Sequence, residues 1–137
     1  MWNPFVKKVS SPLADDDRAV IDQMKKMGLD LSQQFVVNHY FYFPNEEAQS
    51  RAKKIIEQSG ALVTGERKNE KWPVRSSHVS VLADEALLAE KIAMMTAIAQ
   101  NEGGEYDGWE ARPGSDPERE RNKEDRVGEM EIVKELP

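Results

Sequence analysis

Apolar residues along the chain follow a period of two in some segments and a helical period in others. The clearest period of two runs from Phe35 to Phe43, a segment rich in the aromatic and β-branched residues that favour strands. Successive side chains of a strand point to opposite faces, so every second residue from Phe35 is expected in the core. The face expected to remain open to water carries Val36, Asn38, Tyr40 and Tyr42.

Three other segments carry apolar residues at helical spacing. The first is predicted to begin at Ser11-Pro12, because serine is a good cap and proline suits the first helical position, and to end at Gly28. The second is predicted within residues 45–60 and the third within residues 84–103, each between an Asn or Asp cap and a terminal glycine. Residues expected on the buried helical stripes include Met27 and Ile55.

Shorter strands are predicted at residues 62–68, 72–82 and 105–111. The first of these is polar, which favours the edge of a sheet. The order is then a helix followed by strand-helix-strand-strand-helix-strand. This order predicts an α+β, ferredoxin-like sandwich (βαββαβ, a four-stranded antiparallel sheet) with an extra N-terminal helix. Right-handed crossovers place the two internal helices on one face of the sheet.

The same pattern divides the chain into three parts. Residues 1–32 are an N-terminal arm and helix, residues 33–111 are the folded domain, and residues 112–137 are a charged tail. Few apolar residues occur at the start of that tail, so burial cannot offset the entropy of ordering it, and we predict that it is mobile. Residues 127–136 regain some alternation, and the sequence leaves open whether they dock on the domain.

Charge and composition argue against several classes of protein, among them nucleic-acid-binding, disulfide-bonded and membrane-spanning proteins. The 137 residues include 19 Lys and Arg against 25 Asp and Glu, a net charge of −6, so direct binding to nucleic-acid phosphates is not expected. The absence of cysteine excludes disulfides and thiolate metal ligands and fits a cytoplasmic protein. No stretch approaches about 20 consecutive apolar residues, so no membrane span is predicted. The N-terminus does not resemble a secretory signal.

Two histidines are the main candidates for catalysis or metal binding. His39 and His78 fall on predicted neighbouring strands, where a pair can transfer a proton or hold a metal. No third ligand follows from the spacing, and Ser77 faces away from His78 because adjacent strand residues point to opposite sides. The acidic residues of segment 105–110 lack the spacing of an oxygen-ligand loop. We predict no metal, no cofactor and no enzyme, with a small enzyme using His39 or His78 as an alternative.

Aromatic residues suggest a binding surface. Tyr40 and Tyr42 would be the stacking residues of an RNA-binding sheet, which is a second alternative. Arg75 is the clearest basic neighbour, and so few basic residues favour a protein partner over RNA. Tyr106 is expected in the core, and Trp109 is either a core residue or an anchor for a partner.

Three pieces of the chain together resemble a known family. They are His39-Tyr-Phe-Tyr-Phe-Pro44 followed by Ala48, the helix stop at Gly60, and Glu105-Tyr-Asp-Gly-Trp109. Over roughly residues 33–110 the chain is similar to the regulator of ribonuclease activity B family, the ribonuclease E inhibitor domain. The resemblance implies a ferredoxin-like α+β domain and a cytoplasmic, non-enzymatic regulator that binds an endoribonuclease and changes RNA turnover. The tail departs from the family, because its charges are balanced up to Arg126.

These observations together predict a regulatory protein that binds another protein, which by the resemblance is an endoribonuclease. The predicted partner-binding surface comprises Tyr40, Tyr42, Arg75, Glu105, Asp107 and Trp109. A homodimeric structural module is a third alternative, since the sequence does not determine the oligomeric state.

Overall fold

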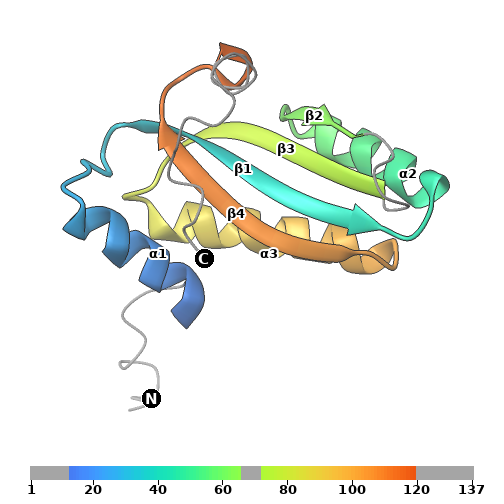
Figure 1. Ribbon diagram of the computed structural model, residues 1–137, viewed down its shortest axis with the longest axis horizontal. Coiled ribbons are helices and arrows are strands. Elements are labelled where there is room, and N and C mark those ends of the chain that lie inside the picture. Colours follow the sequence, from blue (N-terminus) through green and yellow to red (C-terminus); the bar gives the residue numbers. More distant parts are fainter. Residues whose placement is uncertain (1–12, 66–71, 120–137) are drawn as a thin grey trace, which may run out of the picture.

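The computed structural model describes residues 13–65 and 72–119 (Figure 1). The predictions for the N-terminal arm, for the end of the predicted strand at residues 66–68 and for the tail beyond residue 119 lie outside the described residues. The elements are α1 (Asp15–Lys26), β1 (Gln34–Phe43), α2 (Glu46–Gln58), β2 (Leu62–Thr64), β3 (Trp72–Val81), α3 (Glu85–Asn101) and β4 (Glu105–Pro113).

The four strands form one antiparallel sheet in the order β2-β3-β1-β4. α2 connects β1 to β2 across β3, and α3 connects β3 to β4 across β1, so the chain forms two split β-α-β units. Both helices lie on one face of the sheet (Figure 1). The predicted α+β class with a four-stranded antiparallel sheet is confirmed, and β2 is a short edge strand as expected.

The core consists of two hydrophobic clusters on the helix side of the sheet. The first cluster joins α1 and the beginning of α3 to the sheet, and it includes Met24, Phe35 and Trp109. The second cluster joins α2 and the end of α3 to the sheet, and it includes Phe41 and Met95. α1 therefore packs on the same face of the sheet as α3 and does not cover the opposite face.

The boundaries of α1 and β4 differ from the sequence prediction. α1 begins at Asp15, with Ala14 at the cap position and no side-chain cap, so the predicted start at Ser11-Pro12 is wrong. Three aspartates in the first turn instead interact with the positive end of the helix dipole. β4 continues to Pro113, because residue 112 still pairs with β1.

Two residues expected in the core are exposed. Met27 is 51% exposed because it follows the last helical residue of α1 and no longer continues the buried stripe. Ile55 is 46% exposed because it lies one position away from the stripe that buries Ile56. Helical spacing identified both segments correctly but assigned these two side chains to the wrong side.

Gly104 lies where α3 turns into β4, and its Cα closely approaches the end of β1. A Cβ atom there would lie 2.5 Å from the main-chain oxygen of Tyr42 and 2.6 Å from Cδ1 of Phe43. Gly104→Ala is therefore expected to lower the free energy of unfolding by about 1–3 kcal/mol, measured by urea denaturation. Gly103→Asn is the control, because Gly103 has a φ of 71° and open space around its Cα, and asparagine tolerates that conformation. Equal losses in both variants would contradict the steric explanation.

Candidate functional site

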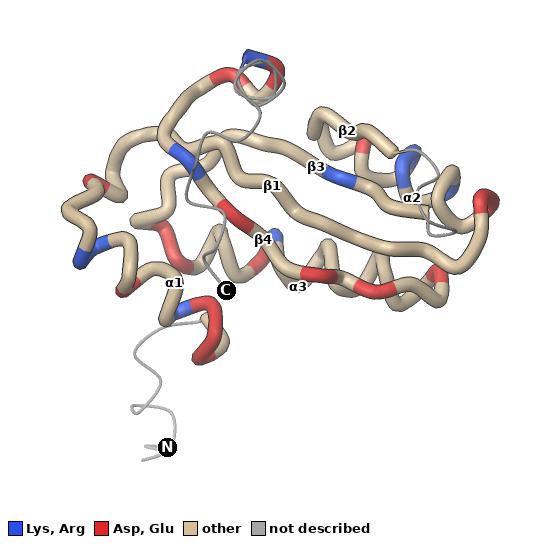
Figure 2. Tube along the Cα trace, viewed as in Figure 1, with Lys and Arg blue, Asp and Glu red and all other residues tan. Residues whose placement is uncertain are grey.

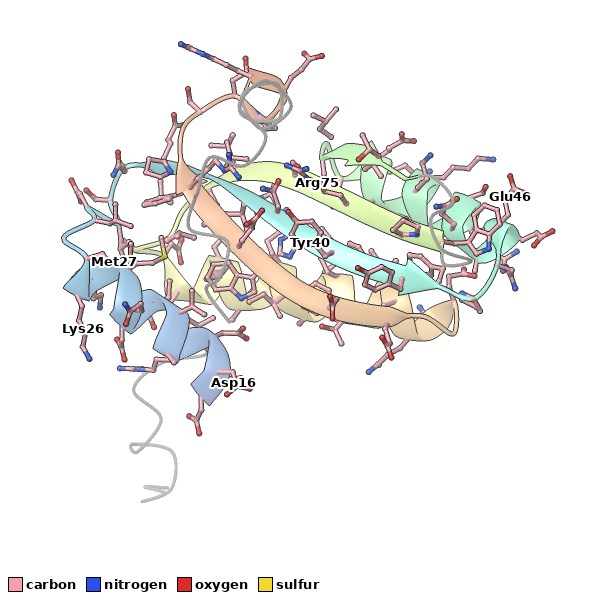
Figure 3. The ribbon with its side chains drawn as sticks, viewed as in Figure 1. Asp16, Lys26, Met27, Tyr40, Glu46 and Arg75 are labelled. Atoms are coloured by element: carbon pink, nitrogen blue, oxygen red, sulfur yellow. The ribbon has the colours of Figure 1, made fainter. Side chains whose placement is uncertain are left out.

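Tyr40 and Arg75 lie together on the sheet face opposite α2 and α3, which we call the open face. Tyr40 is directly opposite Arg75 in the pairing of β1 with β3. The guanidinium carbon of Arg75 lies 5.9 Å from the centroid of the Tyr40 ring, and Figure 3 shows the two side chains next to each other. A cation–π contact of this kind orients both side chains. The open face comprises Asn38, Tyr40, Tyr42, Arg75, Ser77 and Glu110.

A buried hydrogen-bond network supports the open face. One carboxylate oxygen of Glu110, Oε2, accepts hydrogen bonds from the Tyr40 hydroxyl at 2.5 Å and from Nδ2 of Asn38 at 3.3 Å. Oδ1 of Asn38 accepts a hydrogen bond from the Ser77 hydroxyl at 2.5 Å. Asn38, Ser77 and Glu110 are all buried, and Val36 on the same face is 1% exposed, so the prediction that Val36 and Asn38 remain open to water is wrong. The network links β3, β1 and β4 and fixes the position of the Tyr40 ring.

The acidic residues of the predicted surface lie on β4, the outer strand. Glu105 is opposite Tyr42, and both Glu105 and Asp107 are exposed. Asp107 is the extra residue of a β-bulge, because Gly108 pairs with Tyr40 while the next residue along β1, Phe41, pairs with Tyr106. Gly108 has a φ of 109°, a conformation that favours glycine.

The same bulge places Trp109 in the core, so its assignment to the partner-binding surface is wrong. Trp109 is 4% exposed and belongs to the first hydrophobic cluster. Its indole Nε1–H donates a hydrogen bond of 2.8 Å to Oδ1 of Asp17 in α1. Strict alternation would direct Trp109 and Tyr106 to opposite faces, whereas the extra residue directs both toward the helices.

Tyr106, His39 and His78 form a hydrogen-bonded chain on the helix side of the sheet, which we call the histidine–tyrosine chain. Nδ1 of His39 lies 2.8 Å from the Tyr106 hydroxyl oxygen, and the two histidine Nε2 atoms are 2.9 Å apart. One Nε2 atom must donate its proton and the other must accept it. The rings are stacked, with centroids 5.0 Å apart and an interplanar angle of 11°. His39 falls between Val37 of the first cluster and Phe41 of the second.

Burial keeps all three groups of this chain neutral at pH 7. Desolvation lowers the pKa of His39 well below its ordinary value, and electrostatic interactions with His78 and Lys91 lower it further. The pKa of His78 falls to about 4, mainly through desolvation and then through the nearby Lys91, against a smaller opposing effect of the Val79 backbone. Desolvation also raises the pKa of the Tyr106 hydroxyl, with a contribution from Asp17.

The geometry of the chain bears on the alternative of an enzyme using His39 and His78. A hydrogen-bonded series of neutral rings can transfer a proton, and His78 lines a cavity of about 650 Å³ together with Lys91. His39 is 0% exposed, so a ligand in that cavity contacts His78 and does not reach His39. The two imidazoles therefore do not face a shared cleft, which was the arrangement that catalysis by both would need.

No group of three or more His, Cys, Asp or Glu side chains within residues 13–65 and 72–119 has a geometry that could hold a metal ion. In the same part of the chain, no helix is long and apolar enough to cross a membrane.

Sequence reasoning missed Glu110 as the centre of the open-face network and missed the contact between Tyr106 and His39. The sequence pattern that could have indicated the network is the alternation that places Asn38 and Tyr40 on one face. Two polar side chains on one face of a strand imply polar partners on the neighbouring strands. Naming those partners required the register of β1 with β4, which the bulge at Asp107 shifts.

Comparison with known proteins gives a match over most of the described structure. Residues 14–111 match the family described as Regulator of ribonuclease activity B. The matched range includes α1 as well as the sheet and its two internal helices. A search of curated proteins found none that matches the chain.

Proposed function

The chain belongs to the regulator of ribonuclease activity B family, and on this premise we propose that it regulates a ribonuclease by binding it, without catalysing a reaction itself. The family assignment supports regulation of ribonuclease activity as the general function. The finer proposal is that the partner is an endoribonuclease of the cytoplasm. We further propose that the open face, together with Glu105 and Asp107, is the contact surface.

The observation that carries this proposal is the fixed position of two partly exposed side chains, Tyr40 and Arg75. Glu110 accepts a hydrogen bond from the Tyr40 hydroxyl, and Arg75 lies against the Tyr40 ring. Side chains that are ordered before binding lose less conformational entropy when a partner arrives. Tyrosine and arginine are also enriched among the residues that dominate the binding energy of protein interfaces.

Acidic residues beside the open face favour a basic surface on the partner. Glu105 and Asp107 are exposed on β4, and Figure 2 shows acidic residues along β4 and at the beginning of α1. The chain as a whole carries a net charge of −6. Opposite charges on two surfaces speed their association and make it sensitive to salt. We therefore infer that the ribonuclease contributes a basic patch.

Tyr40→Ala is expected to weaken binding to purified ribonuclease E by about 30-fold, because truncating a central aromatic residue of an interface typically costs about 2 kcal/mol or more. Titration calorimetry measures the affinity, and cleavage of a short RNA in the presence of each variant measures the inhibition. Inhibition should decrease in parallel with affinity.

Two variants serve as controls for this measurement. Tyr40→Phe keeps the ring and should retain most of the affinity, and Ile55→Ala changes an exposed residue on α2 and should retain all of it. If Tyr40→Ala binds as tightly as the unmodified chain, the open face is not the contact surface. If the unmodified chain neither binds nor inhibits the ribonuclease, the proposed function itself fails.

A further inference from the structure

Strand β3 is paired along only part of its length on the side of β2. β3 has ten residues, yet its pairing with β2 includes three of them, from Arg75 to Ser77. Within residues 13–65 and 72–119, no strand pairs with Val79–Val81 on that side. Figure 1 shows β2 beside only a portion of β3. This portion of β3 is therefore an open sheet edge in the part of the chain that the structure describes.

The residues of the open edge lack the side chains that usually protect exposed strands. Natural edge strands carry proline, lysine or inward-pointing charges that prevent pairing with another chain. Residues 78–82 read His-Val-Ser-Val-Leu and contain none of these. Val79 and Val81 are partly exposed, and valine favours the extended conformation.

A cavity of about 650 Å³ lies directly beside this edge. It is bounded by the end of α2, by Leu62 at the start of β2, by Ser77–Val79, by Lys91 and by Asp116–Glu118. The chain enters β2 from α2 through Gly60, which has a φ of 92°, and among the described residues no strand occupies the position next to Val79 on the side away from β1. The cavity has room for several residues of another chain.

The charges around the cavity favour a cationic occupant. Asp116 and Glu118 contribute two carboxylates, against the single ammonium of Lys91 among the lining residues. Oδ1 of Asp116 accepts hydrogen bonds from the backbone N–H groups of Glu118 and Arg119, which fixes that carboxylate in place. The carbonyl end of α2 adds negative partial charge and has no basic residue in its last turn.

From these observations we propose that an extended basic segment of a partner protein adds to the sheet as a fifth strand along Val79–Val81. The backbone of the segment pairs with the free edge of β3, and its Lys or Arg side chains contact Asp116 and Glu118. Strand addition of this kind takes affinity from main-chain hydrogen bonds and specificity from alternate side chains. The identity of the partner rests on the proposed function, whereas the binding mode does not.

A synthetic peptide of alternating Lys and Val, acetylated and amidated at its ends, tests the proposal on the full chain. Titration of isotope-labelled protein should shift the amide resonances of Val79, Ser80 and Val81 first, and hydrogen exchange should slow at those of these amides that point away from β1. Replacing the peptide lysines with glutamate should weaken binding by about tenfold or more, because the charge pairing is reversed. The double variant Asp116→Asn with Glu118→Gln should weaken binding of the lysine peptide.

The decisive control is a peptide of the same sequence with N-methyl groups on all of its backbone amides, because methylation of alternate amides would leave one edge of the peptide able to pair. This peptide keeps its charge but cannot form the ladder of main-chain hydrogen bonds, so its binding should be lost. Equal binding of the methylated peptide, or shifts confined to other parts of the sheet, would overturn strand addition. The test contains no ribonuclease, so its failure would leave regulation through the open face intact.

Discussion

Trp109→Ala is expected to lower the free energy of unfolding by about 3–5 kcal/mol, the usual cost of removing a large buried aromatic side chain. Trp109 is 4% exposed and joins α1 to β1 and α3 in the first hydrophobic cluster. Its loss also leaves Asp17 without the indole donor at 2.8 Å. Urea denaturation followed by far-ultraviolet circular dichroism measures the change.

Two further variants separate packing from hydrogen bonding at this position. Trp109→Phe keeps much of the apolar contact and should lose distinctly less stability than Trp109→Ala. Asp17→Ala removes only the acceptor and should cost about 0.5–1.5 kcal/mol. A change below about 1 kcal/mol for Trp109→Ala, which is typical of exposed positions, would show that the side chain is not part of the core.

Acidification from pH 7 to pH 4 is expected to remove roughly 3 kcal/mol of stability through His78 alone. The pKa of His78 is about 4 in the folded protein, below its ordinary value of 6.5, so the unfolded chain binds the proton first. Each pH unit between the two pKa values is worth about 1.4 kcal/mol. The stability contributed by the neutral ring is complete above about pH 6.5 and is lost as pH falls to about 4. His39, whose pKa is also lowered, acts in the same direction.

The pH dependence is measured by urea denaturation at intervals between pH 4 and pH 7. His78→Gln keeps a polar side chain that does not titrate, and its unfolding free energy should vary less over this range. The groups facing His78 are His39, Lys91 and, across the cavity, Asp116 and Glu118. Asp116→Asn with Glu118→Gln therefore shows what the carboxylates contribute. An unchanged slope in His78→Gln would assign the acid sensitivity to groups other than this ring.

The fold follows from features that are local in the sequence. The alternation from Phe35 to Phe43 identified β1 and its two faces, and caps such as Asn45 and Asp84 identified the beginnings of α2 and α3. Both caps are present, with side-chain oxygens that accept hydrogen bonds from Ala48 and Leu87. Such signals depend on only a few neighbouring residues, so they can be recognised in the sequence without knowledge of the tertiary structure.

The surface was harder to predict because it depends on pairing between distant segments. Tyr40 and Tyr42 were assigned to the correct face by alternation, but the proximity of Arg75 to Tyr40 and of Glu110 to both Tyr40 and Asn38 follows from register. One extra residue at Asp107 reverses the direction of Trp109. Gly108 within an apparent strand was the only local sign of that bulge. The histidine pair was expected on neighbouring strands, yet its contact with Tyr106 required the same register.

The core is divided into two clusters, and α3 is the helix that connects them. Among the described helices, α1 contributes to the first cluster, α2 to the second, and α3 to both. A disturbance beneath α1 can therefore reach α2 only by way of α3 or the sheet. Because α3 contacts both clusters, either cluster can unfold locally while the other remains packed against α3.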